Sequence, residues 1–265
     1  MKKIFISADI EGVSGITSWE ATRYGGKGYD AACRQMSLET AAACRAALAA
    51  GYQVVVKDGH EDAMNIDHTL LPKEAELISG WTCSPLSMLG GIDDTFAGVI
   101  YIGYHSGAWT NTSPLKHTCE DYVYNWFKIN GRYATEFTIN AGVADEFGVP
   151  SLLLAGDAGI CQTAEAEYPG IVTVTTKTGV GNATWNVHPD KVIDDIERNV
   201  AEVLSKPLPN PRPLEKQYTM TLCYKEFQKA AAASWFPGMQ KIDDFTVSYT
   251  APKPTELSRC RYFVG

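Results

Sequence analysis

Continuous apolar runs that each end in a polar residue are the feature that most constrains the fold of this chain. The segments 52–60 (YQVVVKDGH), 97–105 (AGVIYIGYH) and 149–157 (VPSLLLAGD) lack the alternation expected of strands that face water on one side. A similar short run, KKIFISAD, covers residues 2–9. Such runs are typical of parallel strands that helices cover on both faces. The pattern therefore predicts a buried central sheet.

Helix-forming segments alternate with these strands. Residues 29–50 are rich in alanine and other helix formers and end before Gly51, which is a favourable C-terminal cap. Further helices are predicted over 134–148, 157–170 and 188–206. This alternation predicts an α/β fold of three layers, α/β/α, with a mainly parallel central sheet.

The last part of the chain has a different composition. The proline-rich segment 207–213 (PLPNPRP) has the character of an exposed connector, and short strand-like and helix-like segments follow it. We therefore predict a larger α/β domain over residues 1–206 and a smaller C-terminal α+β portion over residues 207–265.

Charge and composition exclude several classes of partner. The net charge is −8 and no cluster of lysine and arginine is present, which disfavours binding to nucleic acid or to an anionic membrane surface. The N-terminal segment lacks the apolar stretch of a signal peptide, and no apolar run reaches the length of about 18 residues that a membrane helix needs. The seven cysteines form no CxxC pair, so we expect free thiols and a cytoplasmic protein.

Acidic and histidine side chains follow the predicted strands. Those at the strand ends are Asp9, Glu11, Asp58, His60, His105 and Asp157. Ligands of open α/β sheets bind at the carboxyl ends of the strands, and these residue types bind divalent metals such as zinc. Sites without cysteine are more often catalytic than structural. Alternation along an extended chain places Asp9 and Glu11 on the same side, and Gly12 allows the backbone to pass close by.

Simpler roles stay open for each of these residues. A single histidine at a strand end is more often a hydrogen-bonded structural residue than a ligand, because a metal needs several convergent ligands. Asp58 and Asp157 are explained as well by strand-end turns as by a role in orienting ligands. His68 and His188 belong to no motif, and we expect them to be structural or on the surface. The residues alone leave a metal site and structural roles equally open.

Five segments form an ordered set over most of the first 160 residues: SADIEG (7–12), DGH (58–60), GGIDDTFAGVIYIGYHSG (90–107), HT (117–118) and EFTINAGVADEFGVPSLLLAGD (136–157). This set resembles the zinc-dependent D-aminopeptidases of the M55 peptidase family. The resemblance implies two zinc ions at the ends of the central strands, with Asp9 bridging them. Glu11, His60, His105 and Glu136 would complete the ligands. His117 would be the catalytic histidine, and the subunits would form a ring-like decamer around a central channel.

Two of these residues depend on the resemblance for their roles. Without it, Glu136 is a carboxylate favourably placed near a helix N-terminus, and His117 is an ordinary loop histidine before an aromatic strand. Lys116 departs from the family pattern, in which a small polar residue is common at this position. The Lys116 side chain either alters the pKa of His117 through its charge or points to solvent.

The function expected from this resemblance is that of a metal-dependent aminopeptidase. It would remove the N-terminal residue of short peptides, including a D-residue such as D-alanine, through a metal-activated water, and it would act as a homo-oligomer. The alternatives are a metal-dependent hydrolase of another amide or ester, a non-catalytic peptide-binding protein and a structural oligomer with incidental metal. The complete ligand set disfavours the last two.

Overall fold

Strand β1 (Lys3–Ala8) lies inside a seven-stranded sheet of order β3-β2-β1-β4-β7-β8-β9. The computed structural model describes residues 2–265. The other strands of this sheet are β2 (Gln53–Asp58), β3 (Ala75–Ile78), β4 (Phe96–Tyr104), β7 (Ser151–Asp157), β8 (Val172–Val180) and β9 (Ala183–Asn186). Neighbouring strands are parallel except for β8 and β9. The predicted mainly parallel sheet is therefore confirmed.

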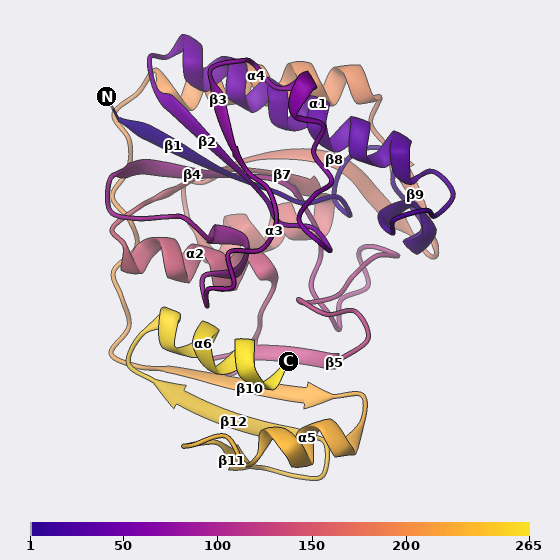
Figure 1. Ribbon diagram of the computed structural model, residues 1–265, viewed down its shortest axis with the longest axis vertical. Helices are drawn as coiled ribbons and strands as arrows, with labels where there is room; N and C mark the ends of the chain where they lie inside the picture. The colour runs from indigo at the N-terminus through magenta and orange to yellow at the C-terminus, as the bar shows by residue number, and fades with distance from the viewer. Residues whose placement is uncertain (1) are drawn as a thin grey trace.

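Helices cover both faces of this sheet (Figure 1). Helices α1 (Tyr29–Ala49) and α4 (Pro189–Leu204) lie on one face, and α2 (Glu136–Glu146) and α3 (Ala158–Glu167) lie on the other. In β1, Ile4 and Ile6 join one apolar core, and Phe5 joins the opposite core with Phe137. Both faces of each central strand are thus buried, which explains the unbroken apolar runs and confirms the three-layer α/β/α fold.

A second, antiparallel sheet forms the smaller part of the molecule, below the first in Figure 1. Its order is β11-β12-β10-β5-β6, and its strands are β5 (Tyr124–Ile129), β6 (Arg132–Tyr133), β10 (Tyr218–Tyr224), β11 (Gln240–Lys241) and β12 (Thr246–Ala251). Helices α5 (Phe227–Ala233) and α6 (Pro254–Val264) pack with it around a separate apolar core. Strands β5 and β6 precede residue 207, so the hairpin 124–133 adds two strands to the predicted C-terminal portion. The boundary at residue 207 stays a prediction.

The strand order reverses between β1 and β4. The chain runs outward from β1 through β2 to β3 and then returns to the other side of β1 as β4. Residue Ala8, at the end of β1, pairs with Asp58 of β2 and with Ile102 of β4, so three strands end at one edge. Such a reversal opens a crevice at the carboxyl ends of the strands.

The chain after β1 passes directly over the end of β4. Asp9 donates its backbone N–H to the carbonyl of Ile102 at 2.8 Å, and Gly12 donates to the carbonyl of Gly103 at 2.7 Å. A Cβ atom at Gly12 would lie 1.8 Å from the carbonyl oxygen of Tyr104. Only glycine fits at this position, which confirms the close backbone approach predicted there.

Three short 3-10 helices lie in the loops: η1 (Trp19–Thr22), η2 (His68–Leu70) and η3 (Ser87–Leu89). Residues 2–265 contain no helix with the length and apolar character that crossing a bilayer requires.

Candidate metal centre

Six predicted site residues converge at the reversal point of the sheet. Asp9 and Glu11 follow β1, His60 follows β2, and His105 follows β4. Glu136 is the first residue of α2, whose N-cap Thr135 accepts a hydrogen bond from the backbone N–H of Thr138. His117 comes from the loop before β5.

Asp9 lies between two histidines and presents a different oxygen to each. His60 Nδ1 is 3.3 Å from Asp9 Oδ1 and 3.1 Å from Glu11 Oε2. His105 Nε2 is 3.3 Å from Asp9 Oδ2 and 3.4 Å from Glu136 Oε1. These five residues are only 1% to 8% exposed. The cluster thus has two halves that share one carboxylate.

Backbone carbonyl groups orient the three histidine rings. His60 Nε2 donates to the carbonyl of Thr22 at 2.6 Å, and His105 Nδ1 donates to that of Ser106 at 3.0 Å. His117 Nδ1 donates to the carbonyl of Leu115 at 3.0 Å. The opposite nitrogen of each ring faces the carboxylates, which is the orientation that metal-ligating histidines adopt.

The buried carboxylates of the cluster require positive charge beside them. Burial alone lowers the pKa of His60 and His105, but the carboxylates around them outweigh it and raise both pKa values well above 6.5. Burial alone would raise the pKa of Asp9, but the neighbouring rings of His105 and His60 hold it well below its usual range. Three buried carboxylates therefore demand positive charge, from protons on the rings or from metal ions.

Two buried atoms of the cluster indicate that metal ions fit the site. Asp9 Oδ2 and His105 Nε2 are buried without a hydrogen-bond partner in the described residues. The ligand atoms of Asp9, Glu11 and His105 lie within 4.8 Å of one another, as do those of His105, His117 and Glu136. Carboxylate and imidazole donors in such compact groups suit zinc and similar divalent ions.

Asp58 and Asp157 hold the loops that carry the histidines, but they do not touch the imidazole rings. Asp58 accepts hydrogen bonds from the backbone N–H groups of His60, Asn65 and Ile66. Asp157 caps α3 and accepts from the backbone N–H of Ser106, next to His105. Both therefore act as turn and capping carboxylates, one of the two roles that the sequence left open.

A buried lysine supports the loop that carries Glu11. Lys177 of β8 is 1% exposed, and its Nζ donates to the carbonyls of Glu11, Val13 and Ile16. These bonds satisfy all three ammonium protons, as a buried charge requires. Lys57 of β2 supports the His60 loop in the same way by donating to the carbonyls of Asp58 and Gly80.

Glu39 of α1 supports the same loop from the helix side. It is fully buried, and its Oε1 accepts hydrogen bonds from the Ser14 backbone N–H at 3.0 Å and from Gln35 Nε2 at 2.8 Å. Its Oε2 has no hydrogen-bond partner among the described residues. Burial raises the pKa of Glu39 to about 7.

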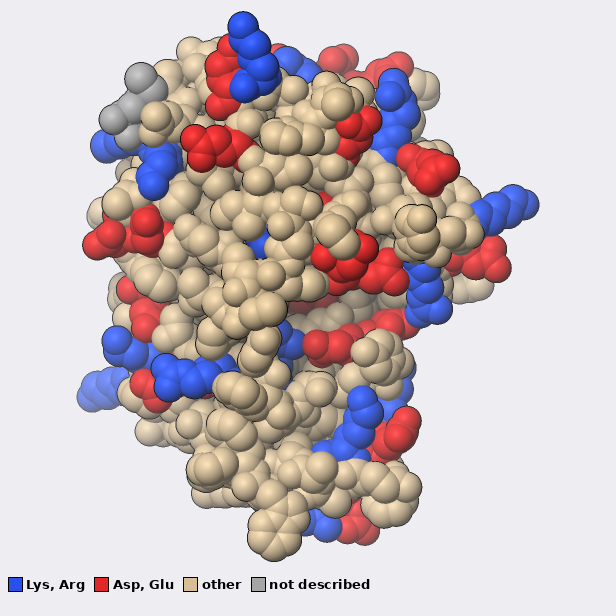
Figure 2. Space-filling model, viewed as in Figure 1, with Lys and Arg blue, Asp and Glu red and all other residues tan. Residues whose placement is uncertain are grey.

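A cavity of about 890 Å³ opens above the cluster, and Asp9, Glu11, His60, His117 and Glu136 line it. His117 stacks on the more buried His105, with ring centroids 4.2 Å apart, and Trp19 meets the His117 ring edge-on at 5.2 Å. Figure 2 shows carboxylates on both sides of a hollow between the upper and lower parts of the molecule. The cavity is large enough for a short peptide.

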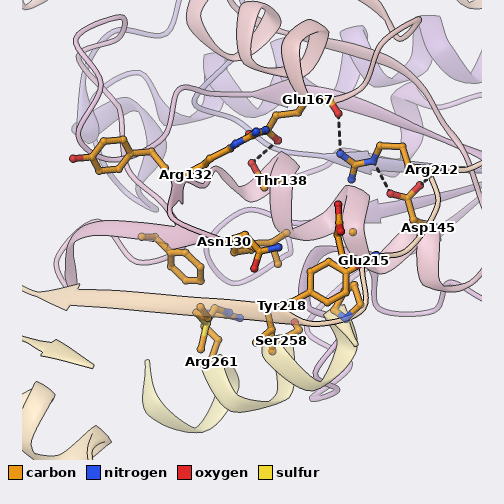
Figure 3. A pocket seen from close by; sticks show the side chains of 18 of the residues that line it. Asn130, Arg132, Thr138, Asp145, Glu167, Arg212, Glu215, Tyr218, Ser258 and Arg261 are labelled. Atoms are coloured by element: carbon orange, nitrogen blue, oxygen red, sulfur yellow. Dashed lines mark hydrogen bonds and ion pairs between the residues drawn. The ribbon is translucent and has the colours of Figure 1, made fainter. Parts of the chain in front are cut away.

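A second cavity, of about 590 Å³, lies between α2 and the antiparallel sheet and shares Ile139 and Arg261 with the first. In Figure 3, Arg212 reaches Asp145, at 2.8 Å, and the carbonyl of Glu167. The polar groups of this second cavity bond mainly to one another. No histidine or cysteine of the described chain lines this cavity. The cavity over the metal cluster is therefore the candidate active site.

Several residues of the site were not predicted from the sequence. Thr22 and Trp19 belong to a segment without regular pattern, and only their long-range contacts reveal a role. Lys57 and Lys177 had a usable signal, since each is a charged residue inside an otherwise apolar or β-branched strand. His68 and His188 lie outside the cluster, on η2 and at the N-cap of α4, as expected for structural or surface residues.

The fold and the site define a class of protein. Carboxylate and imidazole ligands without thiolate, at the reversal point of a parallel sheet and beneath a large cavity, are typical of metal-dependent hydrolases.

Comparison with known proteins identifies the family. The family model of the M55 peptidases, described as D-aminopeptidase, matches residues 1–262. A D-aminopeptidase of Bacillus subtilis (strain 168) is 31% identical over 258 residues, which cover 94% of this chain and 91% of that protein. The solved structure of a zinc-dependent D-aminopeptidase, DppA from Bacillus subtilis, described as a self-compartmentalizing protease, superposes with a TM-score of 0.92. That match has 28% identity and covers 99% of this chain and 96% of the other. The chain belongs to the M55 family of peptidases and is an enzyme of the D-aminopeptidase type.

The buried Glu39 predicts a pH-dependent difference between the wild type and Glu39→Gln. A carboxyl whose pKa rises from 4.5 to about 7 on folding stabilises the native state below pH 4.5, and that contribution is lost as the pH rises through 7. Glutamine retains the acceptor for Ser14 but does not ionise. We expect Glu39→Gln to gain up to about 3 kcal/mol over the wild type between pH 5 and pH 8 in urea unfolding. A difference that does not change with pH would contradict this interpretation.

Proposed function

We propose that this enzyme uses two zinc ions to remove the N-terminal residue of short peptides, including peptides that begin with a D-residue such as D-alanine. The observation that carries the proposal is the position of Asp9, whose two oxygens face His60 and His105. A carboxylate shared in this way is suited to bridge two cations. The zinc-dependent relative DppA supports the choice of metal.

The ligand assignment follows the two halves of the cluster. Asp9, Glu11 and His60 would hold one ion, and Asp9, His105 and Glu136 would hold the other. The Cys119 backbone N–H donates to Glu136 Oε1 at 2.7 Å and fixes the position of that carboxylate. When bound, the ions supply Lewis-acid polarisation of the peptide carbonyl and activate water at neutral pH.

We propose that His117 handles a proton on the substrate side of the cluster. Its Nδ1–H is held by the carbonyl of Leu115, so Nε2 is free to accept or donate a proton in the cavity. Nε2 lies 3.6 Å from Glu136 Oε1, a longer distance than the His60 and His105 contacts. His105 is buried beneath it, whereas His117 lines the cavity. The alternative is that His117 is a further metal ligand, and experiment must distinguish this role from proton transfer.

The first test of this function is metal content. We expect purified protein supplied with zinc to hold about two ions per chain by elemental analysis. Asp9→Ala should hold far less, because it removes a ligand shared by both sites, whereas Asp62→Ala, at an exposed residue, should hold as much as the wild type. A wild-type chain that stays metal-free in excess zinc, with the circular dichroism of a folded protein, would rule out the two-metal site.

The second test separates the catalytic role of His117 from ligation. His117→Ala should keep its metal and bind substrate nearly normally, and it should lose turnover by about 10²–10⁴-fold on aminoacyl p-nitroanilides. His60→Ala should instead lose metal. The proposed role is wrong if His117→Ala retains wild-type turnover or loses metal as His60→Ala does.

We also propose that the chain forms a homo-oligomer that restricts the active site to short peptides, with the decamer implied by the family resemblance as the expected size. Large aromatic side chains are exposed on the smaller part, with Trp235 at 88% and Phe263 at 68%, as expected of a surface that a neighbouring subunit covers. Light scattering tests this directly. A monomer at micromolar concentration, or rapid cleavage of a folded protein, would count against an enclosed site.

A cytoplasmic location stays part of the proposal. All seven cysteines are free, as expected in a reducing compartment. Fractionation of the native cells would test it, and recovery with an extracytoplasmic fraction would contradict it.

A further inference from the structure

Six acidic residues line the cavity over the metal cluster: Asp9, Glu11, Glu61, Glu120, Asp121 and Glu136. Three of them, Asp9, Glu11 and Glu136, belong to the cluster with His60 and His105. Two others are engaged by arginines, since Arg261 holds Glu120 at 2.9 Å and Arg23 holds Asp121 at 2.9 Å. Glu61 has no ion-pair partner within the described part of the chain, and its one side-chain hydrogen bond there is a long one, of 3.4 Å, from the Tyr24 backbone N–H. Its negative charge is therefore the one not already neutralised.

Glu61 occupies a defined position beside the metal cluster. It directly follows the proposed ligand His60, and it is an exposed residue that lines the cavity. Its φ of 44° is in the left-handed region, which is uncommon for a residue other than glycine. The Trp81 indole N–H donates to the Glu61 carbonyl at 2.6 Å and supports this conformation. The backbone that carries the Glu61 carboxylate is thus fixed by a hydrogen bond.

We propose that Glu61 binds the protonated α-amino group of the peptide substrate. This inference rests on the proposed aminopeptidase function. An α-amino group with a pKa of about 8 is cationic at neutral pH, and its hydrogen bonds to a carboxylate are charge-assisted. In an aminopeptidase only the α-carbon separates this group from the carbonyl that reacts. Its partner must therefore lie next to the metal ligands, as Glu61 does.

The position of the charge also accounts for selection of a free N-terminus. An N-acylated peptide has no cation to offer Glu61, and its binding would leave the carboxylate without a partner. The charges of the two arginine-bound carboxylates are already balanced by Arg23 and Arg261, so these carboxylates attract a cationic amine less strongly than Glu61 does. Glu61 would thereby favour substrates cleaved at the first residue over those cleaved internally.

The test compares Glu61→Gln with Asp62→Asn in the metal-loaded enzyme. Asp62 carries the same charge one residue further along the chain, but it lines a different cavity. With D-alanine p-nitroanilide at pH 7, we expect Glu61→Gln to raise KM by about 10- to 100-fold at unchanged metal content and with much smaller loss of kcat. Asp62→Asn should behave as the wild type. The gap between Glu61→Gln and wild type should narrow above about pH 8, where the substrate amine loses its proton.

Three results would overturn the inference: an unchanged KM in Glu61→Gln, an equal change in Asp62→Asn, or an effect confined to substrates with a cationic side chain. The last result would show that Glu61 recognises a side chain and not the N-terminus. All three results can be observed only if the wild-type enzyme is active. If the proposed function itself is wrong, the metal-loaded wild type will release no N-terminal residue, so the two failures can be distinguished.

Discussion

The pairing of β1 with β2 on one side and with β4 on the other is the constraint on which the site depends. Parallel register ends the three strands at one edge, so Asp9, His60 and His105 meet there although they are far apart in sequence. The close passage of Gly12 over the end of β4 keeps the following chain at that edge. Asp9 lies between the two histidines. A shift of β1 by one residue would therefore turn the Asp9 side chain to the opposite face and remove its contacts with both histidines.

Buried charge around the cluster is balanced locally. The cluster concentrates three carboxylates in a buried site, and two buried lysines lie behind the loops that carry these residues. Burial lowers the pKa of Lys177 to about 8, although nearby carboxylates, Asp157 and Glu39 foremost, act in the opposite direction. The lysine therefore both fixes the carbonyls of the loop and contributes positive charge beside Glu11. Rigid support of this kind keeps ligands in place before a metal binds.

The site residues that directly follow strands could be predicted from the sequence. Asp9, Glu11, His60 and His105 follow recognisable apolar runs, and the α/β rule places such residues together. Glu136 and His117 could not be predicted in this way. A glutamate is favourable at any helix N-terminus, and a histidine is ordinary in a loop, so neither residue by itself indicates a metal. Only the family resemblance selected them. The structure brings both to the cluster, while their chemical roles stay proposals. The pairing of β5 with β10 and the contact of Thr22 with His60 escaped prediction because both join distant segments that have no local pattern in common.

The central claim is that one carboxylate, Asp9, serves two metal ions. Anomalous diffraction on crystals of the zinc-loaded enzyme, recorded on both sides of the zinc absorption edge, tests it most directly. The account predicts two zinc peaks per chain about 3.5–4 Å apart, each with one oxygen of Asp9 as a ligand. A single peak, or two peaks of which only one contacts Asp9, would contradict it.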